Sequence, residues 1–172
     1  MRYLLAAAAL FFMAVLHVSA MSHVEVLGVT PDLLLAFAAC WAIVRGQREA
    51  MVVVPLAGLL RDLTTSDPIG TSMLALSPIV LLAAARELRT VETEFVPALA
   101  VVATATLAYT VLRVGILAGT GQEVDWAGAL LRVALPGAVV NALFTPIVYL
   151  PVRWLSPALR PGVVGVGRTV PL

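Results

Sequence analysis

The sequence predicts an all-α polytopic integral membrane protein with six transmembrane helices and both termini in the cytoplasm. Three observations lead to this prediction: the composition, six apolar stretches, and the placement of the arginines. Of the 172 residues, 61% are hydrophobic and only 12% are charged, whereas soluble domains carry about 25% charged residues. A lipid bilayer accommodates so apolar a chain because lipid removes the need for a polar outer surface.

Six apolar stretches are separated by short polar connections. They cover residues 3–20, 31–44, 51–63, 68–85, 96–118 and 126–150. A helix needs roughly 20 apolar residues, and at least about 17, to span a bilayer, so the second and third stretches are short. The third also contains Pro55, and we expect it to be broken, tilted or partly re-entrant. Pro136 and Pro146 predict kinks in the long sixth stretch.

Three of these stretches begin with residues that favour helix starts. Thr30 offers a capping hydroxyl before Pro31 at the first helical position, with Asp32 in the first turn. The pair Asp67-Pro68 repeats the pattern before the fourth stretch, and Asp125 is placed to cap the sixth.

Arginine placement predicts the orientation. All eleven basic residues are arginines. If all six stretches span the membrane, eight of them lie on one side: Arg2, Arg45, Arg48, Arg86, Arg89, Arg153, Arg160 and Arg168. The connections on the other side contain none. Basic residues favour the cytoplasmic side, so the sequence predicts cytoplasmic termini and a multi-pass protein of the cytoplasmic membrane.

The first stretch has a second interpretation. A positively charged start, an apolar run and the small residues Val18-Ser19-Ala20 also fit a secretory signal with a cleavage site. The charge bias does not separate the two, because cleavage leaves the other five helices oriented as before. The five further apolar stretches, with no soluble domain to export, favour the uncleaved form.

The chain is predicted to form a single transmembrane domain, residues 1–155, followed by a flexible Pro/Gly-rich cytoplasmic tail, residues 156–172. The connections leave no room for a soluble catalytic domain. The near-zero net charge argues against a nucleic-acid partner. We find no spacing of histidines, cysteines or acids typical of a metal site, and no nucleophile or phosphate-loop motif. The sequence therefore predicts no enzyme activity and no cofactor.

Five charged residues fall inside the apolar stretches: Asp32, Arg61, Asp62, Arg113 and Arg132. The predicted topology places all five in the outer half of the membrane, where they could form one inter-helix polar cluster that holds the fold, docks a partner or lines a small-ligand pocket. In the simpler interpretation, arginines near helix ends reach the headgroups and Asp32 is only a first-turn acid. Asn141, deep in the sixth stretch, is expected to bridge helices.

Three segments resemble the MreD family of rod shape-determining membrane proteins. They are PDLLL at residues 31–35, GLLRDL at residues 58–63 followed by DPIG at residues 67–70, and NALFTP at residues 141–146 followed by RWL at residues 153–155. The motif residues within them are Asp32, Gly58, Asp62, Asp67, Pro68, Gly70, Asn141 and Pro146. The resemblance does not extend to Arg61. The length and the six-helix layout agree over essentially the whole chain.

This resemblance implies a non-catalytic scaffold in the bacterial cytoplasmic membrane. Such proteins are associated with an MreC-like protein and with the peptidoglycan polymerase and transpeptidase complex of the cell-elongation machinery. The family fold is also similar to the substrate-binding S component of energy-coupling-factor vitamin transporters. The alternative is therefore a solute-binding subunit, in which the outer-half polar residues line a vitamin pocket.

Overall fold

The computed structural model describes residues 2–19, 24–65, 67–87 and 95–155, and the regular elements among them are all helical. This confirms the predicted all-α class. The tail at residues 156–172 lies outside the described residues. The helices are α1 (Arg2–Ser19), α2 (Leu33–Arg45), α3 (Gln47–Thr64), α4 (Thr71–Ala75), α5 (Pro78–Glu87), α6 (Phe95–Gly119), α7 (Trp126–Gly128), the π-helical segment η2 (Ala129–Ala134) and α8 (Leu135–Leu155).

The centre of the bundle is α2, which packs against α1, α3, α5, α6 and α8. Its residues 33–43 are all buried, as expected for a helix that is apolar on every side. Neighbouring helices thus surround the second stretch on all sides. On one flank, α1 buries Ala6, Leu10 and Ala14, which lie on one face because they are four residues apart.

The third stretch forms one unbroken helix, so the expected break or re-entrant turn is wrong. Helix α3 begins at Gln47, four residues before the predicted start, and continues through Pro55 to Thr64. The apolar pattern begins only at Met51 because the first turn of this helix, residues 47–49, is polar. Its 18 residues make a rod of about 27 Å.

The break lies instead in the fourth stretch. A single helix was expected from Pro68, but α4 covers only Thr71–Ala75 and α5 begins at Pro78. Pro78 has no backbone N–H to donate to the preceding turn, so the helical hydrogen bonding stops there. Leu76 closes the short helix by donating to the carbonyl of Ser72 at 2.9 Å.

The sixth stretch is a continuous rod that changes its winding. Asp125 caps it as predicted, accepting a hydrogen bond from the Gly128 N–H at 3.0 Å. The segment η2 then widens the helix, and the N–H of Leu135 donates to the carbonyl of Leu130. The next residue, Pro136, donates nothing, and such π segments are a common response to a local loss of regular hydrogen bonding. The rod then runs on through Pro146 and Pro151.

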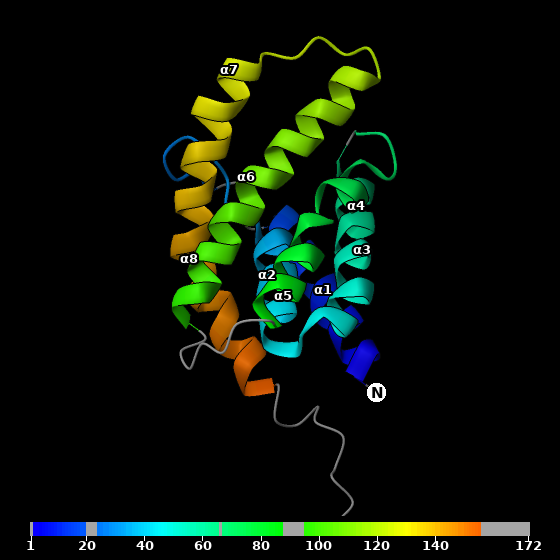
Figure 1. The fold of residues 1–172 in the computed structure, drawn as a ribbon, viewed down its shortest axis with the longest axis vertical. Helices are drawn as coiled ribbons and strands as arrows, with labels where there is room; N and C mark the ends of the chain where they lie inside the picture. Colours follow the sequence, from blue (N-terminus) through cyan, green and yellow to red (C-terminus); the bar gives the residue numbers. More distant parts are fainter. Residues whose placement is uncertain (1, 20–23, 66, 88–94, 156–172) are drawn as a thin grey trace, which may run out of the picture.

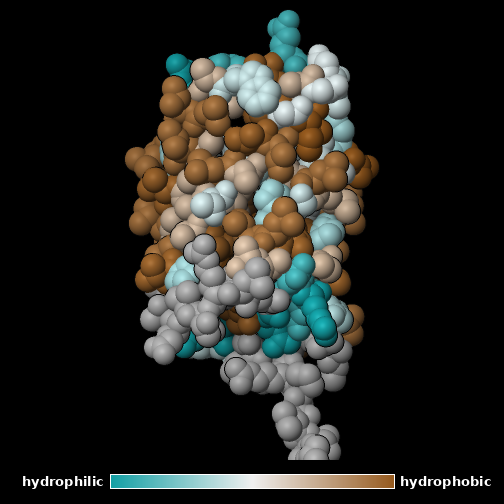
Figure 2. All heavy atoms as spheres, viewed as in Figure 1, coloured by the Kyte–Doolittle hydropathy of each residue, from teal (hydrophilic) through white to brown (hydrophobic). Residues whose placement is uncertain are grey.

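The outer surface is largely apolar. In Figure 2 hydrophobic side chains cover the middle of the visible face, with hydrophilic residues toward its two ends. Within the described residues, two helices are long and apolar enough to cross a membrane, at Val96–Gly119 and Trp126–Trp154. They stand side by side and reach beyond the other helices at the end opposite the N-terminus (Figure 1). The other apolar helices are shorter, so the six-span count remains a prediction.

Gly58 sets the distance between α3 and α4. A Cβ atom built at this residue would lie 2.5 Å from the Cα of Met73 and 2.7 Å from its backbone nitrogen. These are backbone atoms, so only a shift of a whole helix could relieve the overlap. The close approach of α3 and α4 therefore requires glycine at this position.

We predict that Gly58→Ala destabilises the fold by about 1–3 kcal/mol, the usual cost of overpacking a tight contact. The measurement is the unfolding free energy of the purified protein in mixed micelles. Gly119→Ala is the matched control, because a Cβ there meets no atom within 4 Å. Equal stability of the two variants would show that α3 and α4 can separate at little cost.

Candidate functional site

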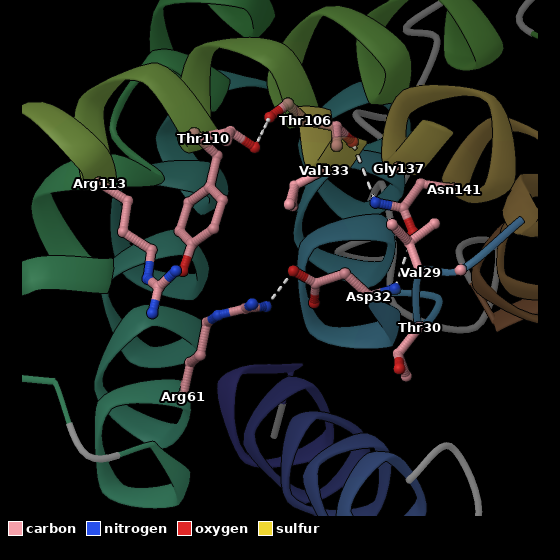
Figure 3. Close-up of a pocket in the computed structure, with 12 residues that line it drawn as sticks. Val29, Thr30, Asp32, Arg61, Thr106, Thr110, Arg113, Val133, Gly137 and Asn141 are labelled. Carbon is pink, nitrogen blue, oxygen red and sulfur yellow. Dashed lines mark hydrogen bonds and ion pairs between the residues drawn. The ribbon is translucent and has the colours of Figure 1, made fainter. Parts of the chain in front are cut away.

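Asp32 joins two helices at the entrance to the buried centre. The cap expected at Thr30 is wrong: Asp32 is the N-cap of α2, which begins at Leu33 rather than Pro31, and its Oδ1 accepts a hydrogen bond from the Leu35 N–H at 3.0 Å. Its Oδ2 forms an ion pair with the guanidinium of Arg61 on α3 (Figure 3). The ion pair expected between the charged residues of separate helices is therefore present.

Asn141 extends this contact to two more helices. Its Oδ1 accepts a hydrogen bond from the Asp32 N–H at 2.7 Å, and its Nδ2 donates to the Thr106 Oγ1 at 3.1 Å. The bridging role expected for this amide is thus seen between α8, α2 and α6. We call Arg61, Asp32, Asn141 and Thr106 the polar network, and it connects α3, α2, α8 and α6.

Tyr109 on α6 packs against the same arginine. The guanidinium carbon of Arg61 lies 4.7 Å from the centre of the Tyr109 ring, within the range of a cation–π interaction. The Tyr109 hydroxyl lies 3.3 Å from that of Ser72 on α4. Arg61 therefore has one anionic and one aromatic neighbour.

Asp62 forms no ion pair with an arginine in the described part of the chain. It is 3% exposed, and its two carboxylate oxygens accept hydrogen bonds from the backbone N–H groups of Gly70 and Ser72 at 2.7 and 2.8 Å. Gly70 has a φ of +99°, which glycine adopts readily. Asp62 thus fixes the end of the α3–α4 turn, which we define as Thr65 and residues 67–70.

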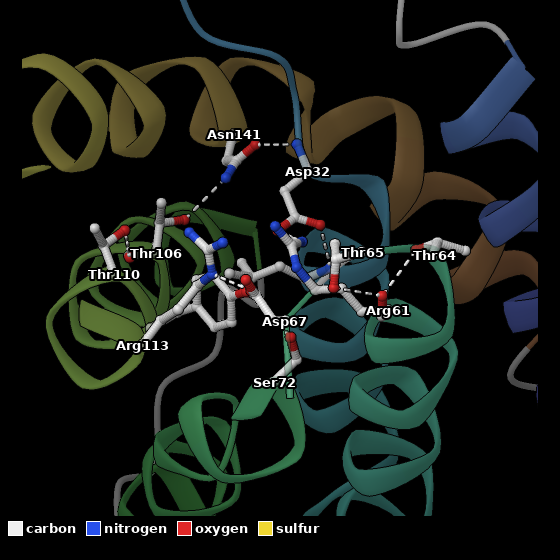
Figure 4. Close-up of polar contacts among 12 residues, drawn as sticks. Asp32, Arg61, Thr64, Thr65, Asp67, Ser72, Thr106, Thr110, Arg113 and Asn141 are labelled. Atoms are coloured by element: carbon white, nitrogen blue, oxygen red, sulfur yellow. Dashed lines mark hydrogen bonds and ion pairs between the residues drawn. The ribbon is translucent and has the colours of Figure 1, made fainter. Parts of the chain in front are cut away.

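Asp67 holds the other side of the α3–α4 turn. Its Oδ2 accepts a hydrogen bond from the Arg113 Nε on α6 at 2.7 Å (Figure 4). It does not cap a helix as expected, because α4 begins only at Thr71. Pro68 also lies in this turn, where its carbonyl accepts a hydrogen bond from the Thr71 N–H at 3.1 Å.

The single five-residue cluster predicted from sequence is wrong in two members. Arg132 lies in η2 with an exposed side chain and forms no ion pair with the described residues. Asp62 belongs to the α3–α4 turn, as described above. Pro146 lies within α8, four residues before Leu150, and is only half-buried. The sequence allowed an estimate of how deep each of the five charged residues lies in the membrane. It did not indicate which face of its helix each residue occupies, and the face decides which residues meet.

A cavity of about 270 Å³ lies beside the polar network. Side chains from α3, α6 and α8 surround it, and the segment before α2 closes one side (Figure 3). The polar side chains of its lining are those of Thr30, Asp32, Arg61, Thr106, Tyr109, Thr110, Arg113 and Asn141. Arg61 and Arg113, two of the arginines of the predicted cluster, thus line one cavity.

Most of the α6 residues that line the cavity were not predicted from the sequence. Thr106, Tyr109, Thr110 and Arg113 all line the cavity. Their spacing of three, one and three residues places them on one face of a helix, so the pattern was available. Of these four residues, the sequence prediction included only Arg113. Hydroxyl groups in apolar helices commonly donate hydrogen bonds to their own backbone, as Thr106 and Thr110 also do, so they are weak indicators of a site.

The site offers hydrogen bonding and charge but no arrangement typical of a reaction. The acids beside the cavity each have an arginine partner, and none of the described residues that line it is a histidine or cysteine. In the described part of the chain, no group of three or more His, Cys, Asp and Glu side chains could hold a metal ion. The geometry suits recognition or structural support.

Comparison with known proteins identifies the family. No curated protein and no solved structure shows significant similarity to the chain. A family model described as rod shape-determining protein MreD matches residues 1–156, which include the polar network, the α3–α4 turn and all the helices. The chain therefore belongs to the MreD family of rod shape-determining membrane proteins of the bacterial cell envelope.

Proposed function

We propose that this chain is a non-catalytic scaffold subunit of the bacterial cell-elongation machinery, which synthesises peptidoglycan. In this role it binds an MreC-like protein and, through it, the peptidoglycan polymerase and transpeptidase complex. The observation that carries the proposal is the family match over residues 1–156. The geometry supports it, because the buried polar groups serve mainly to fix helices and one turn.

The proposed contact for the partner is the α3–α4 turn. Asp62 and Asp67 hold it from two sides through hydrogen bonds to Gly70 and Arg113. Ile69 projects from this fixed backbone with 76% of its surface exposed. A rigid turn that presents an apolar side chain loses little conformational entropy when a partner binds, so it is well suited to be a docking point.

The proposed placement is multi-pass in the cytoplasmic membrane, with six spans and both termini inside. The asymmetry of eight arginines to none supports this orientation. In this arrangement α4 and α5 together form the fourth span, and the α3–α4 turn and the cavity lie toward the outer face. Packing of α1 against α2 and α3 favours its retention over cleavage as a signal.

The cavity gives some support to the alternative of a vitamin-binding transporter subunit. Its volume of about 270 Å³ lies just below the range of roughly 300–1,000 Å³ typical of small-molecule sites. The Asp32 carboxylate and part of the Arg61 guanidinium already form an ion pair with each other. The small volume and this ion pair favour the scaffold over a vitamin-binding subunit. Tight, saturable binding of a vitamin by the purified chain would overturn it.

The topology predicts that tags at residues 1 and 172 react only after the cells are permeabilised. A cysteine placed at the exposed Gln122, between α6 and α7, should be labelled in intact cells by an impermeant maleimide, because it lies outside. The native Cys40 is buried and gives little background. External labelling at residue 1, or a mature chain that begins at Met21, would contradict six spans.

The contact proposal predicts that Ile69→Asn weakens co-purification with an MreC-like subunit by about tenfold or more, as expected for loss of a central apolar contact. Because Ile69 is exposed, the variant should insert and melt like the parent protein. Leu27→Asn is the matched control, since Leu27 is 66% exposed in another connection. Undiminished association of a folded Ile69→Asn variant would exclude this turn as the contact.

A further inference from the structure

The cavity beside the polar network is lined by an excess of hydrogen-bond donors. The Nε of Arg61 is buried and has no hydrogen-bond partner. Arg113 uses its Nε for Asp67, and its two terminal nitrogens make no hydrogen bond with the described residues. The free terminal nitrogens of Arg113 are donors at the cavity wall, so the cavity favours an occupant that supplies acceptors.

The carboxylate and amide oxygens of the cavity wall each accept a hydrogen bond within the protein. Both oxygens of Asp32 accept hydrogen bonds, from Leu35 and from Arg61, and the oxygen of Asn141 accepts one from the Asp32 N–H. Among the described residues, the charged side chains of the lining are Arg61, Arg113 and Asp32. Asp67 lies outside the lining, and its 2.7 Å ion pair balances the charge of Arg113. The donors that Arg113 does not use for Asp67 suit a ligand that supplies anionic acceptor oxygens.

The position of the cavity narrows the class of ligand. Val133, on its rim, is 49% exposed, and the Arg113 side chain is 36% exposed, so the cavity communicates with the outer surface of the bundle. In the proposed topology this opening lies near the headgroups of the outer leaflet. Guanidinium groups bind phosphate oxygens through paired hydrogen bonds, and about 270 Å³ holds a headgroup rather than a large solute.

We propose that the cavity binds a phosphate group, held by Arg61 and Arg113 and carried either by a lipid headgroup or by free inorganic phosphate. The phosphate oxygens accept hydrogen bonds from the terminal nitrogens of Arg113, with the Arg61 guanidinium beside them in the cavity wall. This proposal relies on the outer placement of the cavity but not on the MreC-like partner. The isolated chain therefore tests it, and its failure is distinguishable from failure of the scaffold proposal.

The experiment is native mass spectrometry of the full chain in maltoside detergent. Three compounds are titrated separately: phosphatidylglycerol, a diacylglycerol with the same acyl chains and no phosphate, and inorganic phosphate. We expect saturable binding of one phosphatidylglycerol or one phosphate per chain, and no comparable binding of diacylglycerol. Binding of phosphatidylglycerol alone assigns a lipid as the source, and binding of inorganic phosphate assigns the free ion.

Two variants locate the binding in the cavity. Arg113→Gln removes one of the two charges, and we expect about tenfold weaker binding or more, because hydrogen bonds to charged groups are strong. Gly137→Leu leaves every charge in place. A Cβ at Gly137 lies at an ordinary 3.6 Å from the Thr106 side chain, so the backbone tolerates it while the longer side chain fills the cavity. This variant should lose binding with little change in melting temperature.

Arg132→Gln is the matched control, because it removes an exposed arginine of η2 that does not line the cavity. It should bind phosphate as the parent protein does. Three results would overturn the proposal: no saturable binding of either phosphate compound, equal binding of diacylglycerol, or equal weakening by Arg132→Gln. If Arg113→Gln does not fold, Gly137→Leu decides the location, and the comparison of compounds on the parent protein is unaffected.

Discussion

The fold depends on how a charged pair is accommodated among apolar helices. Asp32 and Arg61 lie on different helices, and their side chains are only 9% and 17% exposed. Charges in such surroundings are costly unless each is paired and hydrogen-bonded. Satisfying this pair brings together α2 and α3, and Asn141 adds α8 and α6 through hydrogen bonds of 2.7 and 3.1 Å.

The same principle extends to the α3–α4 turn. One turn of α3 carries both Arg61, directed toward the α2 end, and Asp62, directed toward the backbone of α4. Gly58, one turn earlier, lets the backbones of α3 and α4 approach closely. The end of α3 therefore positions the bundle centre and the turn together. A partner that binds the turn contacts a segment whose geometry is determined by the core, which suits a scaffold.

Much of this architecture could be predicted from the sequence, because composition and apolar runs report on burial directly. The all-helical class, the Asp125 cap and the need for an ionic partner to Arg61 were all predictable. The break at Pro78 and the continuity through Pro55 were not, since proline disrupts a helix only where neighbours do not compensate. The roles of Asp62 and Asp67 also escaped prediction. Each depends on contacts eight or more residues away, which local patterns do not encode.

The most direct test of this account is a double-mutant cycle on Asp32 and Arg61, with unfolding free energies measured in mixed micelles. Asp32→Asn preserves an oxygen that can cap α2, so it removes mainly the charge. Either Asp32→Asn or Arg61→Gln alone should cost about 3–5 kcal/mol, because each leaves the other charge buried and unpaired. The account predicts that the double variant is more stable than at least one single variant. Additive costs of the two substitutions would contradict it and show that the pair does not organise the fold.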